Sequence, residues 1–331
     1  MRVVFSLIAV IVLVLIAWVG TDVAGLTYLF AVIIPYLAAA AFTIGVVYRV
    51  LKWAGSPVPF RIPTTCGQQK SLPWIKHSYL ESPHSTLGVI ARMALEILFF
   101  RSLFRNTKLN LKEGPRLVYG AEKYLWLAGL AFHWSFLIIF LRHFKYFVEP
   151  VPFWVGWIQN LDGFFQIGLP IIYATDAVLL AAVTFLFLRR VVDPKLRFIS
   201  LAADYFPLFL ILGIGVSGVW MRYFTKTDIV SVKELATGLV GFSFNAPPDG
   251  ISAIFYIHFF LVSVLFAYFP VSKLMHMGGV FMSPTRNLAN DNRMKRHVNP
   301  WDYPVKVHTY EEWEDEFRDV MKAADMPLEK E

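Results

Sequence analysis

Four histidines lie in apolar stretches of this chain, where an ionisable side chain is unusual. They are His133, His143, His258 and His276. The first two share the run Val118–Phe147, and the last two share Ile251–Gly279. A single His in an apolar helix is often a hydrogen-bonded packing residue. Two in each of two runs favour metal ligation, because ionisable groups in hydrocarbon are costly and usually functional.

The spacing of these residues suits two ligand pairs at different membrane depths. Ten residues separate His133 from His143, a rise of roughly 15 Å, whereas His258 and His276 fall on one face of a straight helix, roughly 27 Å apart. Antiparallel packing of the two runs would pair His143 with His258 and His133 with His276. The unequal distances require helix tilt, a skewed axis between the sites or a bend at Pro270.

Haem is the metal group that these pairs favour. Zinc and copper sites usually add Cys or carboxylate ligands, and neither accompanies the four histidines. Cys66 is the only cysteine, which excludes intrachain disulfides, iron–sulfur clusters and covalently attached c-type haem. Aromatic side chains could wall a flat apolar ring; these are Phe132, Trp134, Phe136, Phe140, Phe255, Tyr256, Phe259 and Phe260. Two imidazoles on each iron leave no open position, so the predicted chemistry is electron transfer.

The composition places the chain in a membrane. Of its 331 residues, 56% are hydrophobic, and the mean hydropathy of +0.53 is too high for a soluble protein of this length. The net charge of +7 resides in loops beside the apolar runs, which indicates the positive-inside rule rather than nucleic-acid binding. We therefore predict an all-α, polytopic transmembrane helix bundle with a dihaem b core.

Six spans are expected. They are Val3–Gly20, Leu26–Tyr48, Val118–Phe147, Phe164–Leu188, Ala203–Tyr223 and Ile251–Gly279. The first begins like a signal peptide, but its apolar core is longer and no small-residue cleavage site follows. Lys and Arg gather in the loops 49–116 and 189–197 and in the tail from Lys273. We therefore predict that both termini are cytoplasmic, with His143 and His258 toward the outer face.

The loop 51–117 is too long to be a simple connector. Prolines predict extended chain in its first half; they are Pro57, Pro59, Pro63, Pro73 and Pro83. Thr86–Asn106 is expected to be an apolar helix with an i,i+4 pair of Arg92 and Glu96. Its remaining charges do not share one face, so we expect it to lie between lipid and a partner subunit. An ordinary lipid-surface helix is the alternative.

Other residues inside the spans are weaker candidates. Asp176 could belong to a proton path or to the haem surroundings, or could make a structural hydrogen bond. Gly213, Gly215 and Gly218 have the G-x-G-x-x-G spacing of a dinucleotide site, but no strand precedes them, so we expect them to let a helix or haem approach closely. A quinol could enter among the outer aromatic residues, where the nearest polar side chains are Arg142, Lys145, Asp162, Gln166 and Tyr256.

After Gly278 and Gly279 the chain becomes polar. Thr309 and Glu312 are expected to form a capping box for a last helix. Its apolar stripe comprises Trp313, Phe317, Val320, Met321 and Ala324. One short helix cannot bury this stripe alone, so we expect a soluble partner to dock on the inner face.

The two histidine spacings, ten residues on one span and eighteen on the last, resemble those of the gamma subunit of respiratory nitrate reductase, a five-helix dihaem cytochrome b. The likeness covers Leu26–Gly279, and the additional first helix departs from it. The tail is similar instead to the DsrM- and HmeC-like branch of that family, found in sulfate- and sulfur-metabolising microbes. The tail segments concerned are Ser283-Pro284-Thr285-Arg286-Asn287, Asn290-Asp291-Asn292-Arg293 and Arg296-His297-Val298-Asn299-Pro300-Trp301.

This resemblance implies three parts: an additional N-terminal transmembrane helix (1–25), a dihaem cytochrome b domain (26–279) and a cytoplasmic partner-docking tail (280–331). It implies that the four histidines are axial ligands of two haems b. It also implies oxidation of menaquinol in the cell membrane and electron delivery to a cytoplasmic iron–sulfur subunit like that of heterodisulfide reductase, in a complex with further membrane and outer-face subunits. A quinone-reducing cytochrome is one alternative, and a transporter or assembly factor that binds metal or haem is another.

Overall fold

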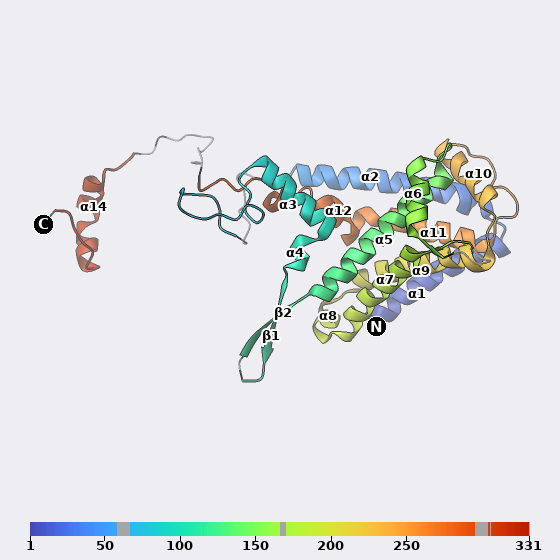
Figure 1. The fold of residues 1–331 in the computed structure, drawn as a ribbon, viewed down its shortest axis with the longest axis horizontal. Helices are drawn as coiled ribbons and strands as arrows, with labels where there is room; N and C mark the ends of the chain where they lie inside the picture. Colours follow the sequence, from blue (N-terminus) through green and yellow to red (C-terminus); the bar gives the residue numbers. More distant parts are fainter. Residues whose placement is uncertain (58–66, 115, 166–169, 295–303, 305, 331) are drawn as a thin grey trace.

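The computed structural model describes residues 1–57, 67–114, 116–165, 170–294, 304 and 306–330. The described chain is mostly helical, and five of its helical segments are long and apolar enough to cross a membrane. These are Arg2–Val23, Leu29–Ala54, Lys123–Phe147, Ala202–Thr225 and Ala253–Val271. The helical character that the sequence predicts is therefore confirmed (Figure 1).

The long helices form one bundle. They are α1 (Arg2–Trp18), α2 (Ile34–Ala54), α5 (Lys123–Phe147), α7 (Ala174–Val192), α9 (Ala202–Trp220) and α11 (Ala253–Tyr268). Within the bundle α11 packs against α1, α2 and α9, while α7 packs between α5 and α9. Short π-helical turns extend α1, precede α2 and extend α9; these are Val19–Val23, Leu29–Ile33 and Met221–Thr225.

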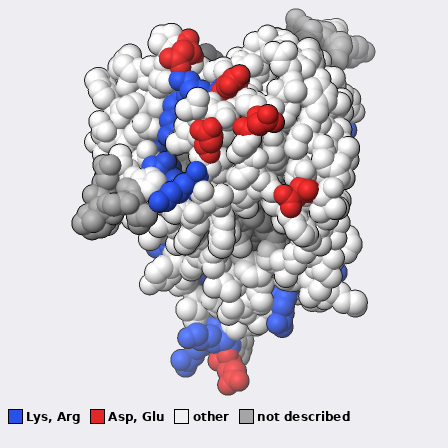
Figure 2. Space-filling model, turned by 90° about the vertical axis from the view of Figure 1, so that its right-hand side faces the viewer, with Lys and Arg blue, Asp and Glu red and all other residues white. Residues whose placement is uncertain are grey.

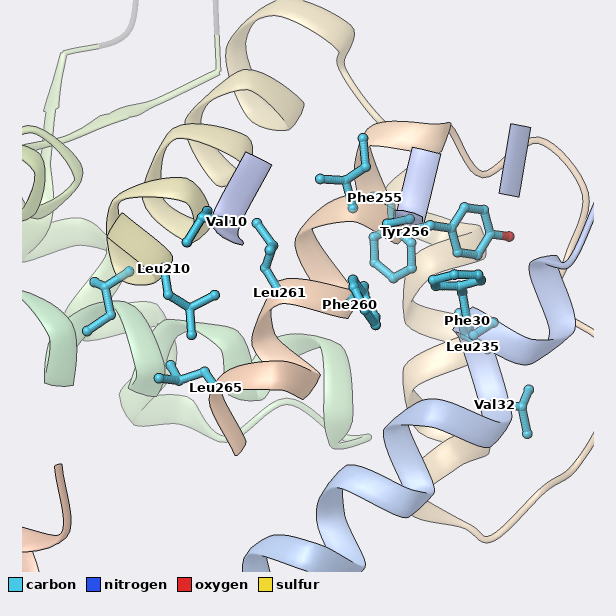
Figure 3. Close-up of a cluster of buried hydrophobic side chains, with 14 of the residues drawn as sticks. Val10, Phe30, Val32, Leu210, Leu235, Phe255, Tyr256, Phe260, Leu261 and Leu265 are labelled. Atoms are coloured by element: carbon cyan, nitrogen blue, oxygen red, sulfur yellow. The ribbon is translucent and has the colours of Figure 1, made fainter. Parts of the chain in front are cut away.

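Helix α11 lies at the centre of the bundle because it is apolar on nearly every face. Leu261 on this helix is fully buried in a cluster with Val10 and Leu210 from two other helices (Figure 3). Phe260 packs edge to face on Phe30, with ring centroids 5.2 Å apart. These contacts hold α11, and with it one of the four histidines, between three neighbouring helices.

The fourth predicted span is shorter than expected. Helix α7 begins at Ala174 rather than near Phe164, because the preceding chain forms two short antiparallel strands, β3 (Gly163–Phe165) and β4 (Ile172–Tyr173). Pro170 favours this interruption, since proline disfavours helix at the residue before it. Helix α7 also carries three charged side chains and is not among the five apolar segments found in the described chain.

The sixth predicted span is not one straight helix. Helix α11 ends at Tyr268, and the chain continues through two 3₁₀ turns, Phe269–Val271 and Lys273–Met275, into the short α12 (His276–Gly279). Pro270 explains the break, because it has no N–H to continue the helix and its ring clashes with the preceding turn. The prediction that the last two histidines share one face of a straight helix is therefore wrong, and the bend at Pro270 is confirmed.

Gly45 on α2 makes room for this bend. A Cβ at position 45 would lie 2.6 Å from the Cβ of Pro270, which is closer than carbon atoms normally approach. Pro270 is fully buried. The proline ring therefore packs directly on the backbone of α2, and the absence of a side chain at Gly45 fixes where the chain can turn.

The loop between α2 and α5 contains two helices, α3 (Thr86–Phe99) and α4 (Arg101–Phe104). They are separated by Phe100, whose φ of 51° lies in the left-handed region. The helix predicted for Thr86–Asn106 is thus present but broken near its end. Of the five prolines in the first half of this loop, Pro59 and Pro63 lie outside the described residues, and the other three lie in turns or irregular chain.

A β-hairpin leads from this loop into α5. Strands β1 (Thr107–Lys112) and β2 (Arg116–Ala121) pair in antiparallel register and project beyond the bundle (Figure 1). Val118, predicted to start the third span, lies in β2, so the span begins at Lys123. The all-α prediction therefore missed two small sheets, because a short apolar run does not by itself distinguish strand from helix.

The remaining short helices are α6 (Phe153–Asp162), α8 (Pro194–Ile199), α10 (Ile229–Val240), α13 (Pro284–Asn287) and α14 (Tyr310–Ala323). Helix α13 packs on α3, and α14 lies apart from the bundle (Figure 1). The predicted capping box of α14 is confirmed: the Thr309 hydroxyl accepts from the Glu312 N–H at 3.2 Å, and the Glu312 carboxylate accepts from the Thr309 N–H at 3.1 Å.

The surface of the bundle is strongly apolar. Large side chains on α1 and α2 are exposed, among them Ile8, Leu15, Leu37 and Ile44. Seen from the end that carries α6 and α10, charged side chains cover only small areas (Figure 2). Extended apolar surface of this kind suits contact with lipid.

Candidate functional site

The four histidines lie on three elements that meet in two places. His133 and His143 are on α5, His258 is on α11 and His276 begins α12. The rings of His133 and His276 are 6.0 Å apart between centroids, with their planes at 81°. His143 and His258 lie close enough to interact electrostatically. The structure therefore brings the rings of His133 and His276 together and places His143 within electrostatic range of His258, as antiparallel packing predicts.

The bend after α11 reconciles the two unequal spacings. From His258 to Tyr268, where α11 ends, the helix rises roughly 15 Å, which equals the rise from His133 to His143. The chain then turns instead of continuing. Because of this turn, His276 lies beside His133, whereas a straight helix would have carried it roughly 12 Å farther along the axis.

Each of the four imidazoles has its Nδ1 bonded to a backbone carbonyl. The contacts are His133 to Gly129 O (2.7 Å), His143 to Ile139 O (2.6 Å), His258 to Ile214 O (3.1 Å) and His276 to Lys273 O (2.8 Å). A carbonyl oxygen only accepts, so Nδ1 must carry the hydrogen, and in the neutral ring Nε2 keeps its lone pair. This arrangement fixes the tautomer and orientation of metal-binding histidines in general.

His258 differs from the others because its Nδ1 reaches across to α9. Besides the carbonyl of Ile214, it lies 3.0 Å from the Ser217 hydroxyl. That hydroxyl bonds to the carbonyl of Gly213 at 2.8 Å, which leaves its oxygen free to accept from the imidazole. Sequence analysis missed Ser217, because only the packing of α9 on α11 brings it to the ring.

The glycines of α9 allow this close packing. A Cβ at Gly218 would lie 3.3 Å from Cε1 of His258, and one at Gly215 would lie 2.9 Å from Leu180. Gly213 is less crowded, since its Cβ would meet Leu261 at 3.4 Å. The three residues lie inside a helix, as expected. They allow neighbouring helices to pack closely on α9 and do not form a dinucleotide site.

The chemistry of each histidine pair fits the axial positions of a haem. Among the described residues, no group of three or more His, Cys, Asp or Glu could hold a metal ion, so a pair offers a metal only two protein ligands. With metal–nitrogen bonds of about 2 Å, two imidazoles on opposite sides of one iron have centroids roughly 6 Å apart. The rings of His133 and His276 have that separation. In the isolated chain both side chains are exposed, while His143 and His258 are half-buried.

Aromatic side chains flank the pair of His133 and His276. Phe132, predicted as part of a haem wall, and Phe100, which sequence analysis missed, each pack edge to face on His133 with centroids 4.9 Å away. Three other predicted wall residues belong instead to the buried core of the bundle; these are Phe255, Tyr256 and Phe260. Trp134, Phe136 and Phe140 are exposed along α5.

A buried cluster of charges lies next to His143. The Arg142 guanidinium is 3.2 Å from the Asp162 carboxylate and 2.5 Å from that of Asp176, and its centre lies 3.7 Å from the ring centroid of Tyr173. Thr175 donates its hydroxyl to Asp162 at 2.6 Å. Asp176 therefore has the structural partner that was one of its three predicted roles, and the cluster joins α5, α6 and α7.

The polar residues predicted to meet a quinol have different surroundings. Arg142 and Asp162 are buried and paired with each other, and Tyr256 is buried in the core. Lys145 is half-buried, with its ammonium 4.9 Å from the ring centroid of Tyr146. Gln166 lies outside the described residues.

Comparisons with known proteins point to one family. The family described as nitrate reductase gamma subunit matches residues 118–297, a range that includes all four histidines. The Hdr-like menaquinol oxidoreductase cytochrome b-like subunit of Archaeoglobus fulgidus is 47% identical over 280 residues, 83% of each chain, and that of Archaeoglobus profundus is 41% identical over 275 residues, 81% of each chain. The respiratory nitrate reductase 1 gamma chain of Escherichia coli is 27% identical over 165 residues, 46% of this chain and 71% of the other.

Proposed function

The chain belongs to the nitrate reductase gamma subunit family, and on that premise we propose that it binds two haems b through its four histidines and carries electrons from menaquinol toward a cytoplasmic partner. Its close relatives are named as cytochrome b-like subunits of a menaquinol oxidoreductase, which makes it a membrane cytochrome b of an electron-transfer complex. The substrate, the direction of flow and the partner are the parts that we propose.

The ligand geometry is the observation that carries this proposal. Four imidazoles in two pairs all have Nδ1 occupied by a carbonyl, so all four present Nε2 as a ligand. A bound haem b supplies one-electron redox chemistry, and with two axial imidazoles it offers no open coordination site. The protein's own part is to orient the rings, keep the surroundings apolar and hold the two pairs at different depths. His143 and His258 would hold the outer group, and His133 and His276 the inner one.

The membrane arrangement that we propose has six spans, with α7 as the sixth. Its 19 residues rise roughly 28 Å, close to the thickness of the hydrocarbon core. Its intramembrane carboxylate, Asp176, is paired with Arg142, and its arginines, Arg189 and Arg190, lie in the last turn. Arg2 at the start of α1 donates to the carbonyl of Ser200 at 2.9 Å, so the N-terminus lies beside the basic loop after α7. The positive-inside rule then puts this end in the cytoplasm.

We propose that the chain divides as the family resemblance implies: an additional first helix (1–25), the dihaem domain (26–279) and a docking tail (280–331). Helix α14 in the tail exposes an aromatic row of Tyr310, Trp313 and Phe317. Only Met321 of its predicted apolar stripe is buried. A soluble iron–sulfur subunit would cover this row and receive the electrons.

A redox-difference spectrum with haem quantification tests the proposal. We expect two haems b per wild-type chain, and we expect His143→Ala and His276→Ala each to lose one, with a different haem lost in each variant. His308→Ala, which changes a tail histidine outside both pairs, is the matched control and should keep both. Retention of both haems in either ligand variant would refute the pairing. A wild-type chain without reducible b-type absorbance would refute the electron-transfer role.

Electron flow can be tested in the same preparation. Menaquinol added to the oxidised complex should reduce both haems, and His143→Ala should leave the haem bound by the inner pair unreduced if electrons enter at the outer pair. Reduction of quinone by the pre-reduced complex, without the reverse reaction, would contradict the proposed direction.

A further inference from the structure

Helix α3 of the inner loop contacts both chain segments that carry the inner histidine pair. Its C-terminal end is hydrogen-bonded to α5, which holds His133. It also packs on α13, which follows α12 and His276. The two elements that carry these histidines, α5 and α12, share no long helix–helix interface, because α12 spans only His276–Gly279. Besides the packing of Pro270 on α2, contacts outside these two elements must therefore help to set their separation.

The contact with α5 is made at the C-terminal end of α3. The last carbonyls of a helix lack partners within it. Here the indole N–H of Trp126 donates to the carbonyl of Phe99 at 2.7 Å, and that of Trp134 donates to the carbonyl of Leu98 at 3.0 Å. The chain then turns at Phe100, whose ring packs on His133. Two tryptophans on α5 thus cap α3 on either side of the inner ligand.

The contact with the tail is made by Arg92 in the middle of α3. This side chain is buried, and its guanidinium donates to the carbonyls of Glu81 at 3.2 Å, of Thr285 at 2.9 Å and of Arg286. The Arg286 side chain in turn pairs with Glu96. The i,i+4 pair of Arg92 and Glu96 that the sequence predicts is therefore replaced: each residue holds the tail instead.

We propose that α3 is a clamp that sets the separation of His133 and His276, with Arg92 as its central positioning residue. The inference rests on the proposed function, because it concerns the haem that these two histidines would share. Arginine suits the task, since its planar fork can serve several carbonyls at once, whereas an ammonium group is a compact point charge. Loss of the guanidinium leaves these partly buried carbonyls without their donor and removes a link between α13 and α3.

The clamp should act on the inner pair alone. The rings of the outer pair are oriented by Ile139, Ile214 and Ser217, none of which belongs to α3 or α13. Removal of groups that orient a metal ligand typically weakens metal affinity by roughly 10- to 100-fold. Weaker binding and an altered ligand field are therefore expected at the inner haem, with the outer haem as an internal reference in the same molecule.

The test compares Arg92→Ala and Arg92→Lys in the full-length complex. Haem content, the low-spin EPR signals and a redox titration are measured for each variant. We expect both variants to lose or weaken the inner haem and to shift its EPR signal and midpoint potential. Arg92→Lys keeps the positive charge, so a shift in that variant reports geometry rather than the field of the charge. Arg105→Ala, which removes an exposed arginine that also pairs with Glu81, is the matched control and should leave both haems unchanged.

Trp134→Phe provides a second, uncharged variant, which removes the indole N–H that bonds to Leu98 on the other side of the clamp and keeps an aromatic ring there. We expect it to shift the same inner signals by less than Arg92→Ala does. Unchanged inner signals in all three clamp variants would overturn the inference while leaving the proposed function intact. Equal loss of both haems in each clamp variant would also overturn it, because that result indicates general unfolding. A wild-type complex without two haems would instead refute the proposed function.

Discussion

Replacing Gly45 with alanine should disturb the inner histidine pair through the bend at Pro270. The new Cβ would lie 2.6 and 2.8 Å from Cβ and Cγ of Pro270. Carbon atoms are best separated by about 3.5–4.0 Å, so a gap of roughly 1 Å must open. The proline ring is rigid and fully buried, which means that α2 and the turn Phe269–Val271 must move apart. Overpacking of this kind costs about 1–3 kcal/mol.

Gly213→Ala is the matched control for this substitution. Position 213 also lies inside a long apolar helix, but its Cβ would meet Leu261 at 3.4 Å and Val10 at 3.6 Å, which are nearly ordinary contacts. Both variants gain about 1 kcal/mol of helix propensity from the same Gly-to-Ala change. The difference in thermal unfolding temperature between Gly45→Ala and Gly213→Ala therefore isolates the clash with Pro270.

Thermal unfolding in detergent and a redox titration of the two haems are the assays. We expect Gly45→Ala to unfold at a lower temperature than Gly213→Ala and to shift the potential of the inner haem, because the turn leads directly into His276. The outer haem should keep its wild-type potential. If Gly45→Ala were as stable as Gly213→Ala and its inner haem were unchanged, the close packing of Pro270 on α2 would be refuted.

Three further substitutions test other parts of the structure. Gly218→Ala should shift the potential of the outer haem and not the inner one, since its Cβ would lie 3.3 Å from the His258 ring; equal shifts would contradict the assigned pairs. Arg142→Met should lower the free energy of unfolding by about 3–5 kcal/mol, because the buried Asp162 and the partly buried Asp176 lose their shared cation. Unchanged thermal stability would show that the cluster is not structural. Burial, with Lys70 and His77 nearby, lowers the pKa of His84 below its usual 6.5. As the pH falls, the unfolded chain therefore takes up the proton on His84 before the folded chain does. The loop between α2 and α5 should then lose stability as the pH falls below 6.5. Hydrogen exchange of residues 67–85 at pH 7.5 and 5.5 measures this loss, which His84→Gln should abolish.

The features that sequence analysis predicted correctly depend on local pattern. The apolar runs and the capping box of Thr309 and Glu312 can be read from neighbouring residues. The bend at Pro270 was one of three ways to reconcile the two spacings, and the backbone chemistry of proline makes it the one that the structure adopts. The glycines of α9 likewise follow from their position within an apolar run.

The features that were missed depend on contacts between distant segments. Ser217 reaches His258 only because α9 packs on α11, and Phe100 reaches His133 only because the chain adopts a left-handed turn after α3. The pair of Arg92 and Glu96 has favourable helical spacing. Arg92 instead donates to carbonyls of the tail, and Glu96 pairs with the Arg286 side chain. Val118 has an apolar neighbourhood that suits a span, but it pairs with Asn110 in a hairpin.

The same dependence on contacts between distant segments distinguishes the two histidine pairs. The outer pair joins two long helices, α5 and α11, and the bundle core that surrounds α11 determines where His258 lies. The inner pair joins α5 to a turn, so its geometry depends on α2, which packs on Pro270, and on the loop and tail segments α3 and α13. A soluble partner that docks on the tail could therefore change the geometry of the inner pair through α13 and α3. The outer pair would keep its geometry, because the bundle core holds it. In the proposed arrangement, the inner pair would therefore be the one whose geometry a docked partner could adjust.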